Sequence, residues 1–237
     1  MYGQISGLNS VKNAIISKFL YSFLYRQFSA IHFYSGMHKG NWVELIVARK
    51  ADQGIELYSG SGKLLSDKTF SSAMPVVRPM SDHELAEEDL FLMVMGIGGN
   101  GVVPSDPSSF PEEENSGNDS HEKFVLMDTY GILLSKEPLD GLEYDAYYGE
   151  FNARIGNKTG RLGLNGIWLV PPMFGSVRPV NKGVYVTTQG DFMGLYANGF
   201  ELVPEYEQMY WVGSAIFIVV RQGAFGMFDL KSKSFDF

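Results

Sequence analysis

A threefold repetition in the last third of the chain is the feature that most limits its fold. Three segments of this region read GRLGLNGIWLVPPMF, GDFMGLYANGFELVPEY and GAFGMFDLKSKSFDF. Within them Gly163, Gly194 and Gly226 each precede an aliphatic residue, and they lie 31 and 32 residues apart. A fixed period of this length is typical of stacked supersecondary units. The sequence therefore predicts a repeat protein.

Each repeat has the pattern of short strands joined by turns. The alternating run at residues 184–188 suits a half-buried strand, and Gln189-Gly190-Asp191 follows it as a turn. Residues 192–196 then return as the second strand of a hairpin. Asn198-Gly199 breaks the chain again before a third run at 200–203, which ends at Pro204. We therefore expect three strands in each unit.

Glycine inside the second strand requires an explanation, because glycine weakens a strand through entropy and lost packing. Its usual justification is a bulge or the close approach of a ring or another backbone. We interpret Gly163, Gly194 and Gly226 as structural repeat glycines rather than as ligand contacts.

These segments resemble the WG-repeat family, whose units carry a Trp-Gly-aliphatic strand, an Asp or Asn with Gly at a turn, and a closing Val/Ile-Pro-Pro followed by Tyr. The matching stretches are Leu162-Gly163-Leu164 with Leu169-Val170-Pro171-Pro172, Met193-Gly194-Leu195 with Leu202-Val203-Pro204-Glu205-Tyr206, and, for the first half only, Phe225-Gly226-Met227. The signature tryptophan is replaced by Leu162, Met193 and Phe225. The resemblance implies a binding surface built from repeats and carries over no catalytic residue.

Weaker copies of the pattern lie at residues 123–135 and 42–70, which brings the total to about five units. We predict an all-β protein with about five three-stranded β repeats. An open stack is favoured, because a period of about 32 residues is short for propeller blades, and a propeller-like ring is the alternative. Residues 40–237 would form this β-repeat domain.

Residues 1–39 are predicted to form an N-terminal helix and cap. Leu8, Val11, Ile15 and Phe19 share one stripe at helical spacing within residues 8–26. Such a helix would cover the open end of a repeat array. A helix lying on a membrane surface is the alternative. A capping-box pattern at residues 81–84 predicts a second, short helix through about residue 89, followed by a strand at 90–95.

The segment Gly96-Ile97-Gly98-Gly99-Asn100-Gly101 fits the G-x-G-x-x-G formula of dinucleotide sites. Phosphate binding there needs a helix directly afterwards, and Val-Val-Pro follows instead. We predict no cofactor. Residues 98–122 are rather a flexible acidic insertion between the two strands of a hairpin, at 90–95 and 123–127. Within it Glu112, Glu113 and Glu114 are candidate docking residues for a basic partner, and a solvated loop is the alternative.

The charge distribution argues against nucleic acid as a partner. Residues 81–122 carry eleven acidic and no Lys or Arg side chains, so the net charge of −8 leaves +3 for the remainder. Binding to a phosphate backbone needs a dense basic face. The chain has no cysteine, and its four histidines lack metal-ligand spacing, so no metal site is predicted.

No apolar run approaches the ~20 residues of a membrane-spanning helix, and the N-terminus lacks the order of a signal peptide. We expect a cytoplasmic protein without membrane insertion.

Two groups of side chains are candidates for function. Tyr206, Tyr210 and Trp211 could form an aromatic binding patch. A second group, Glu143, Asp145 and Glu150 near several tyrosines, could serve a glycosidase, but we interpret it as a polar junction between repeats.

We predict a non-enzymatic module that binds a protein or peptide partner. The alternatives are a carbohydrate-binding or cell-envelope-binding protein and a glycoside-hydrolase-like enzyme.

Overall fold

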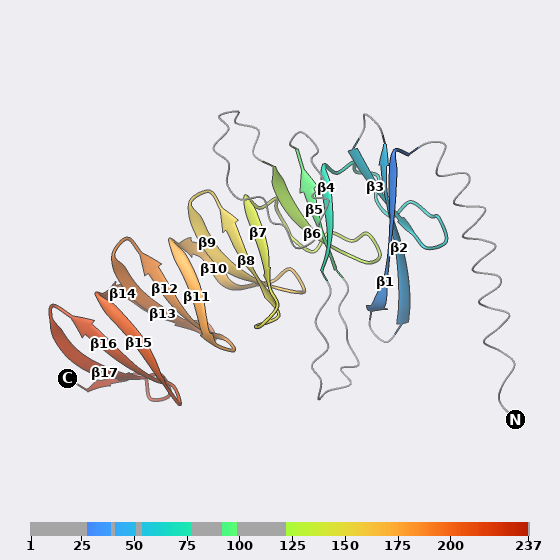
Figure 1. The fold of residues 1–237 in the computed structure, drawn as a ribbon. Helices are drawn as coiled ribbons and strands as arrows, with labels where there is room; N and C mark the ends of the chain where they lie inside the picture. Colours follow the sequence, from blue (N-terminus) through green and yellow to red (C-terminus); the bar gives the residue numbers. More distant parts are fainter. Residues whose placement is uncertain (1–27, 39–40, 51–53, 77–91, 99–121, 237) are drawn as a thin grey trace, which may run out of the picture. The chain divides into compact units, whose positions relative to one another are not determined.

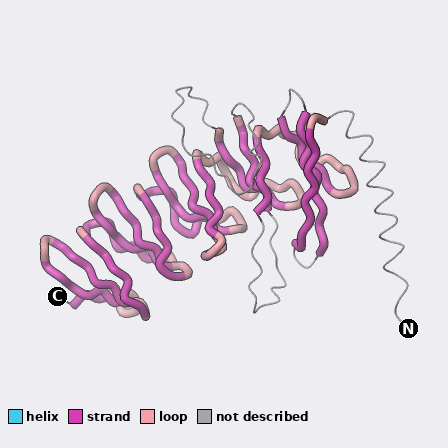
Figure 2. Tube along the Cα trace, in the orientation of Figure 1, coloured by secondary structure: helices cyan, strands magenta, loops and turns pink. Residues whose placement is uncertain are grey.

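The computed structural model describes residues 28–38, 41–50, 54–76, 92–98 and 122–236. Within these ranges the chain forms eighteen β-strands and no helix (Figure 2). The strands make five small antiparallel sheets, which we number first to fifth in chain order (Figure 1). The all-β prediction and the number of units are confirmed. The helices predicted at 8–26 and 81–89 lie outside the described residues.

The chain divides into two compact units, one up to Pro138 and one from Leu139 onward. The boundary predicted between residues 39 and 40 falls in the connection between two paired strands. Ala30–His38 therefore belongs to the first sheet and not to a separate cap.

The first unit contains two three-stranded sheets. The first sheet has the order β1-β2-β3, with β1 (Ala30–His38), β2 (Asn41–Lys50) and β3 (Gly54–Ser59). The second has the order β4-β5-β6, with β4 (Ser72–Val76), β5 (Leu92–Ile97) and β6 (Lys123–Asp128). β5 pairs with β6 as predicted, whereas residues 99–121, which include Glu112, Glu113 and Glu114, lie outside the described residues.

Alternation along β2 explains how this unit packs. Leu45 and Val47 point into a core with side chains of β3, β5 and β6, so the two sheets share one apolar layer. The intervening Ile46 and Ala48 pack on the opposite face against Phe28. β2 is thus buried on both faces, which matches its continuous apolar run.

The second unit contains three four-stranded sheets (Figure 1). The third sheet consists of β7 (Gly141–Asp145), β8 (Glu150–Ile155), β9 (Lys158–Gly163) and β10 (Trp168–Phe174). The fourth consists of β11 (Ser176–Asn181), β12 (Val184–Gln189), β13 (Phe192–Ala197) and β14 (Phe200–Tyr206). The fifth consists of β15 (Gln208–Gly213), β16 (Ile216–Arg221), β17 (Ala224–Asp229) and β18 (Ser234–Asp236).

The prediction of three strands per unit is wrong for these sheets, because each has a fourth strand. β10 and β14 also run through Pro171, Pro172 and Pro204, where we expected strand ends. Both are edge strands, and their pairing with the neighbouring strand shifts register near the prolines. Proline is tolerated at such places, because an edge bulge demands no N–H for the ladder.

Gly194 is explained by a close backbone approach. A Cβ on Gly194 would lie 2.4 Å from the Leu202 carbonyl oxygen and 2.7 Å from the Pro204 nitrogen. Gly160 has the same surroundings, with the Val170 oxygen at 2.5 Å. Gly160, and not Gly163, is therefore the counterpart of Gly194, and the repeat glycines are spaced by 34 and 32 residues. Gly163 instead ends β9.

This alignment identifies equivalent positions in the three sheets. The residue after the repeat glycine and its partner on the preceding strand lie on one face, which we call the forward face. These pairs are Arg161 with Asn152, Leu195 with Val186, and Met227 with Ile218.

The three sheets stack with a forward face against the back face of the next sheet. Val186 and Leu195 of the fourth sheet pack against Phe217 and Val219 of the fifth. Val170 and Phe174 of the third sheet likewise contact Val177 and Tyr185 of the fourth. The core of the second unit therefore lies between its sheets.

Candidate functional site

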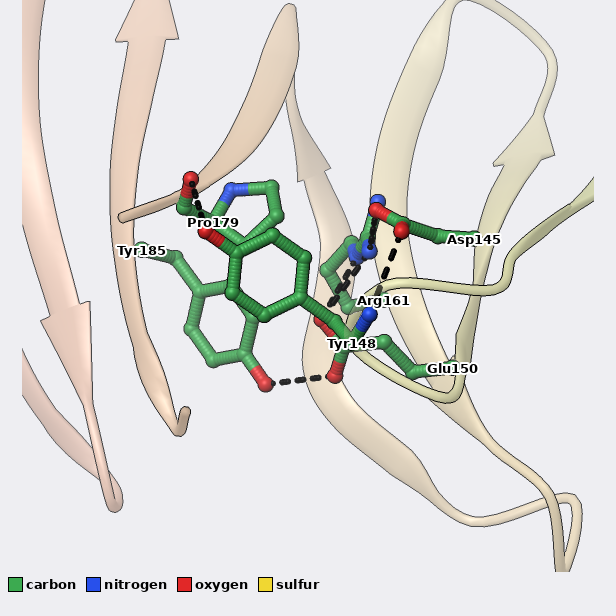
Figure 3. A network of polar contacts seen from close by, with 6 residues as sticks. All are labelled: Asp145, Tyr148, Glu150, Arg161, Pro179 and Tyr185. Carbon is green, nitrogen blue, oxygen red and sulfur yellow. Dashed lines mark hydrogen bonds and ion pairs between the residues drawn. The ribbon is translucent and has the colours of Figure 1, made fainter. Parts of the chain in front are cut away.

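A buried polar network joins the third and fourth sheets (Figure 3). Arg161, 3% exposed, donates to Glu150 Oε1 from Nε at 3.1 Å and from Nη2 at 2.9 Å. Its Nη2 also contacts Asp145 Oδ2 at 2.8 Å. From the fourth sheet, the Tyr185 hydroxyl donates to Glu150 Oε2 at 2.8 Å. Both oxygens of the buried Glu150 are thus bonded. We call these four residues the polar junction.

A tight turn between β7 and β8 positions the acidic members. Gly149 has a φ of 68°, and its N–H donates to the Asp145 carbonyl at 2.8 Å. The Asp145 side chain accepts the Tyr148 N–H at 3.3 Å, which holds the carboxylate near Arg161. The Tyr148 hydroxyl then donates to the Pro179 carbonyl on β11 at 3.4 Å (Figure 3). The turn supplies a second link between the sheets.

A cavity of about 380 Å³ lies beside the polar junction. Both sheets line it: Glu143, Tyr144, Asp145, Ala146, Asn152 and Arg161 from the third sheet, and Val177, Arg178 and Pro179 from the fourth. Oδ1 of Asn152 is buried and has no hydrogen-bond partner among the described residues. Buried acceptors of this kind are normally satisfied by water or by a ligand.

The next junction along the chain shows why the cavity forms. Between the fourth and fifth sheets, Met209 and Trp211 occupy the positions that Val177 and Pro179 hold here. The smaller side chains leave space that methionine and tryptophan would fill. Asn152 and Arg161 stand where the fourth sheet has Val186 and Leu195. The same backbone therefore builds one polar, hollow junction and one apolar junction.

Tyr185 gives the polar junction a pH dependence. Burial, the hydrogen bond to Glu150 and the Glu150 charge raise its pKa above the ordinary value. An unfolded tyrosine loses its proton near pH 10, while the folded one keeps it. Above about pH 10 the unfolded state therefore binds fewer protons than the folded state, so stability falls as the pH rises.

We expect Tyr185→Phe to lower the free energy of unfolding by about 1.5–3 kcal/mol at neutral pH, as for a lost bond to a charged group. Its stability should then decline less steeply than that of the wild type above about pH 10. Urea denaturation at a series of pH values measures both effects. A variant that loses stability in parallel with the wild type at alkaline pH would contradict the assignment to Tyr185.

The forward face of the fifth sheet is apolar and exposed. Tyr210, Ile218 and Met227 form one cross-strand row, and Phe225 lies in the next row on the same face. They are 53%, 39%, 43% and 72% exposed in that order. The counterparts of Ile218 and Met227 in the fourth sheet, Val186 and Leu195, are buried under the fifth sheet. We call the surface formed by Tyr210, Ile218, Phe225 and Met227 the end face.

The three aromatic residues proposed as one patch do not share a surface. Tyr206 is buried and its ring stacks on Phe235 with centroids 5.8 Å apart. Trp211 pairs with Phe217 on the back face of the fifth sheet, whereas Tyr210 lies on the end face. Adjacent residues of a strand point to opposite faces, which separates Tyr210 from Trp211.

Two of the three acidic residues proposed as a polar junction, Glu143, Asp145 and Glu150, lie together in the structure. Asp145 and Glu150 meet at Arg161, whereas Glu143 is exposed at the cavity wall. Sequence reasoning missed Arg161 and Tyr185. The available signal was the Gly160-Arg161 pair, 34 residues before Gly194-Leu195, which places an arginine at an apolar repeat position.

No group of three or more His, Cys, Asp or Glu side chains in the described ranges could hold a metal ion. The part of the chain that the structure describes also contains no helix long and apolar enough to cross a membrane. No protein-family model matches the sequence, and the search of curated proteins found no match to it.

Proposed function

We propose that the chain is a non-enzymatic β-repeat module, an open stack of WG-like units that binds a protein partner through its end face. This proposal rests on the exposure of Ile218 and Met227, because the equivalent residues of the fourth sheet, Val186 and Leu195, are buried. Contiguous exposed apolar surface of this kind marks interaction sites. The resemblance to WG repeats, which implies binding surfaces without catalytic residues, supports the same function.

The stacking within the second unit indicates what the partner presents. The equivalent face of the fourth sheet is covered by the back face of the fifth, through Met209, Phe217 and Val219. A matching partner offers a flat β-sheet face of aliphatic and aromatic side chains. Sheets that pack in this way lie about 10 Å apart, so the contact is made by the side chains on the two facing surfaces and not by the backbones.

A photo-crosslinking experiment tests this proposal. Phe225 is replaced by benzoylphenylalanine in the full chain, and Phe192, an exposed phenylalanine of the fourth sheet, is replaced in a control. We expect crosslinks to a protein from position 225 and none from position 192. Equal crosslinking at the two positions, or none at 225, would contradict the end face as a binding surface.

Carbohydrate binding in the cavity is a second candidate function. The lining has balanced formal charge, with Glu143 and Asp145 against Arg161 and Arg178, and Tyr144 adds a ring. Neutral hydroxylated ligands suit such walls, because they exchange hydrogen bonds with both carboxylates and guanidinium groups. Asp145 and Glu150 are both bonded to Arg161, which gives them structural partners and supplies no observation in favour of glycoside hydrolysis.

Isothermal titration of the full chain with a panel of neutral oligosaccharides tests this second candidate. We expect Asn152→Val to abolish any binding, because it removes a polar group of the cavity wall. Asn157→Val changes an exposed residue of the β8–β9 turn and serves as the control. Absence of heat with every sugar, or equal loss in both variants, argues against the cavity as the site.

A further inference from the structure

We infer that the cavity beside the polar junction binds a neutral sugar that carries an N-acetyl group, and that it holds the secondary amide of this group between the third and fourth sheets. The inference rests on the second candidate function, carbohydrate binding in the cavity, and names the class of sugar. It does not depend on the end face.

The fourth sheet presents backbone groups to the cavity through its edge strand β11. The Pro179 carbonyl points away from β12, because it accepts the Tyr148 hydroxyl of the third sheet at 3.4 Å. A proline fits this place, since its missing N–H would have faced the open side. The pairing with β12 is regular from Ser176 to Pro179, and backbone groups along an antiparallel strand alternate between partner and open side. The N–H and C=O of Val177, which lines the cavity, therefore also point away from β12.

Contacts to the third sheet close this edge on both sides of Val177. On one side the Thr159 hydroxyl donates to the Gly175 carbonyl at 3.3 Å. On the other side the Tyr148 hydroxyl donates to the Pro179 carbonyl. A peptide that adds as a further strand needs a run of open backbone groups. The edge therefore accommodates a single amide group and not an extended peptide.

The third sheet presents an acceptor on its side of the cavity. Asn152 lies in one cross-strand row with Glu143 and Arg161, and all three line the cavity. The Arg161 guanidinium donates to Glu150 and Asp145, whereas Asn152 Oδ1 is buried and accepts no hydrogen bond from the described residues. A buried acceptor of this kind calls for an N–H or O–H donor inside the cavity.

A trans secondary amide fits between these two groups. Its C=O and N–H point in opposite directions across one plane, and the cis form is strongly disfavoured. When its carbonyl accepts the Val177 N–H, its own N–H points toward the third sheet, where Asn152 Oδ1 can accept it. One group of the ligand thus serves a backbone donor of one sheet and the unpaired acceptor of the other.

The rest of the lining suits the body of a sugar. Glu143 accepts hydrogen bonds and Arg178 donates them, so together they can bind hydroxyl groups without requiring a charged ligand. Tyr144 and Pro179 add apolar surface for the C–H face of a sugar ring. The volume of about 380 Å³ is near the lower end of the range for small-molecule sites, which favours a small sugar.

An NMR titration of the isotope-labelled full chain tests the inference. The probes are N-acetylglucosamine and glucose, which has a hydroxyl in place of the acetamido group. We expect the Val177 amide proton to move downfield with N-acetylglucosamine and to stay in place with glucose. The dissociation constant of N-acetylglucosamine should be lower than that of glucose by about tenfold or more, as for two additional hydrogen bonds.

Two variants separate the loss of the site from the loss of the fold. Val177→Met introduces the side chain that the fifth sheet carries at this position, Met209. It should fill the cavity and abolish binding of N-acetylglucosamine, while the amide spectrum keeps the dispersion of a folded protein. Asn157→Val, in the exposed β8–β9 turn, should bind like the wild type. Unchanged binding by Val177→Met overturns the inference.

The pattern of binding shows which proposal fails. Equal affinity for glucose and N-acetylglucosamine overturns the role of the amide and leaves carbohydrate binding in the cavity standing. N-acetylglycine methylamide carries amides without hydroxyl groups, and binding as tight as that of N-acetylglucosamine overturns a sugar as the ligand. Absence of any change with both sugars overturns the inference, and the second candidate function falls with it if the oligosaccharide panel also gives no heat.

Discussion

Replacement of Arg161 by alanine is expected to lower the free energy of unfolding of the second unit by about 3–5 kcal/mol, the range measured when one partner of a buried ion pair is removed. Glu150 is buried, and two of its contacts come from this guanidinium. Without Arg161 the Glu150 charge would stay in a low-dielectric junction, where the Tyr185 hydroxyl still donates to it. The third and fourth sheets should then separate at lower denaturant.

Urea denaturation of the full chain, followed by tryptophan fluorescence, measures this loss. Arg154→Ala is the matched control, because Arg154 is an exposed arginine of the same sheet, and its Nη2 donates to the Asp140 carbonyl at 3.3 Å. Its expected cost is within about 0.5 kcal/mol, as for most surface substitutions. Equal effects of the two substitutions would mean that the polar junction contributes little to stability.

The fourth sheet supplies a design that separates charge from volume. It has Val184 and Leu195 at the positions of Glu150 and Arg161. The triple variant Glu150→Val, Arg161→Leu and Tyr185→Phe replaces the polar junction by apolar groups. Such replacements of buried ion pairs are often neutral or stabilising. We therefore expect the triple variant to recover most of the stability that Arg161→Ala loses, and a further loss would contradict this reasoning.

Gly194→Ala is expected to cost about 3 kcal/mol or more, at the upper end of the range for overpacking. Its Cβ would lie 2.4 Å from the Leu202 oxygen and 2.7 Å from the Pro204 nitrogen. Both atoms belong to the backbone, so a change of rotamer cannot relieve the contact. β14 would have to move away from β13, and the core between the fourth and fifth sheets would open.

Gly141→Ala is the control for this prediction. A Cβ there would first meet the Arg154 Cβ at 3.5 Å, an ordinary contact distance, and the substitution would remove glycine from an edge strand. We expect a neutral or slightly stabilising effect of up to about 1 kcal/mol. Thermal unfolding of both variants measures the two changes in stability. A Gly194→Ala protein as stable as the wild type would show that β14 adapts without cost.

The local parts of the fold could be predicted from the sequence because their signals are local. The hairpins of β12 with β13 and of β16 with β17 combine alternating apolar residues with a glycine turn. β11 was missed because Arg178 and Pro179 interrupt its pattern, although an edge strand tolerates both.

The candidate site depends on register and stacking, which a sequence pattern does not contain. Aligning Gly163 with Gly194 concealed that Arg161 occupies an apolar repeat position. The end face was beyond sequence reasoning for a different reason. Val186 and Ile218 look alike as β-branched residues in alternating strands, yet one is buried and the other exposed. Val186 is buried because the fifth sheet covers it, whereas no described sheet of the second unit covers Ile218.

The prolines of β10 and β14 have a consequence for the kinds of assembly open to this protein. Pro171, Pro172 and Pro204 remove backbone donors along an outer edge of the third and fourth sheets. A foreign strand cannot form a continuous ladder there, so this edge is a poor template for fibrous aggregation. The edge strands β10 and β14 can thus stay exposed to solvent without acting as templates for fibre growth.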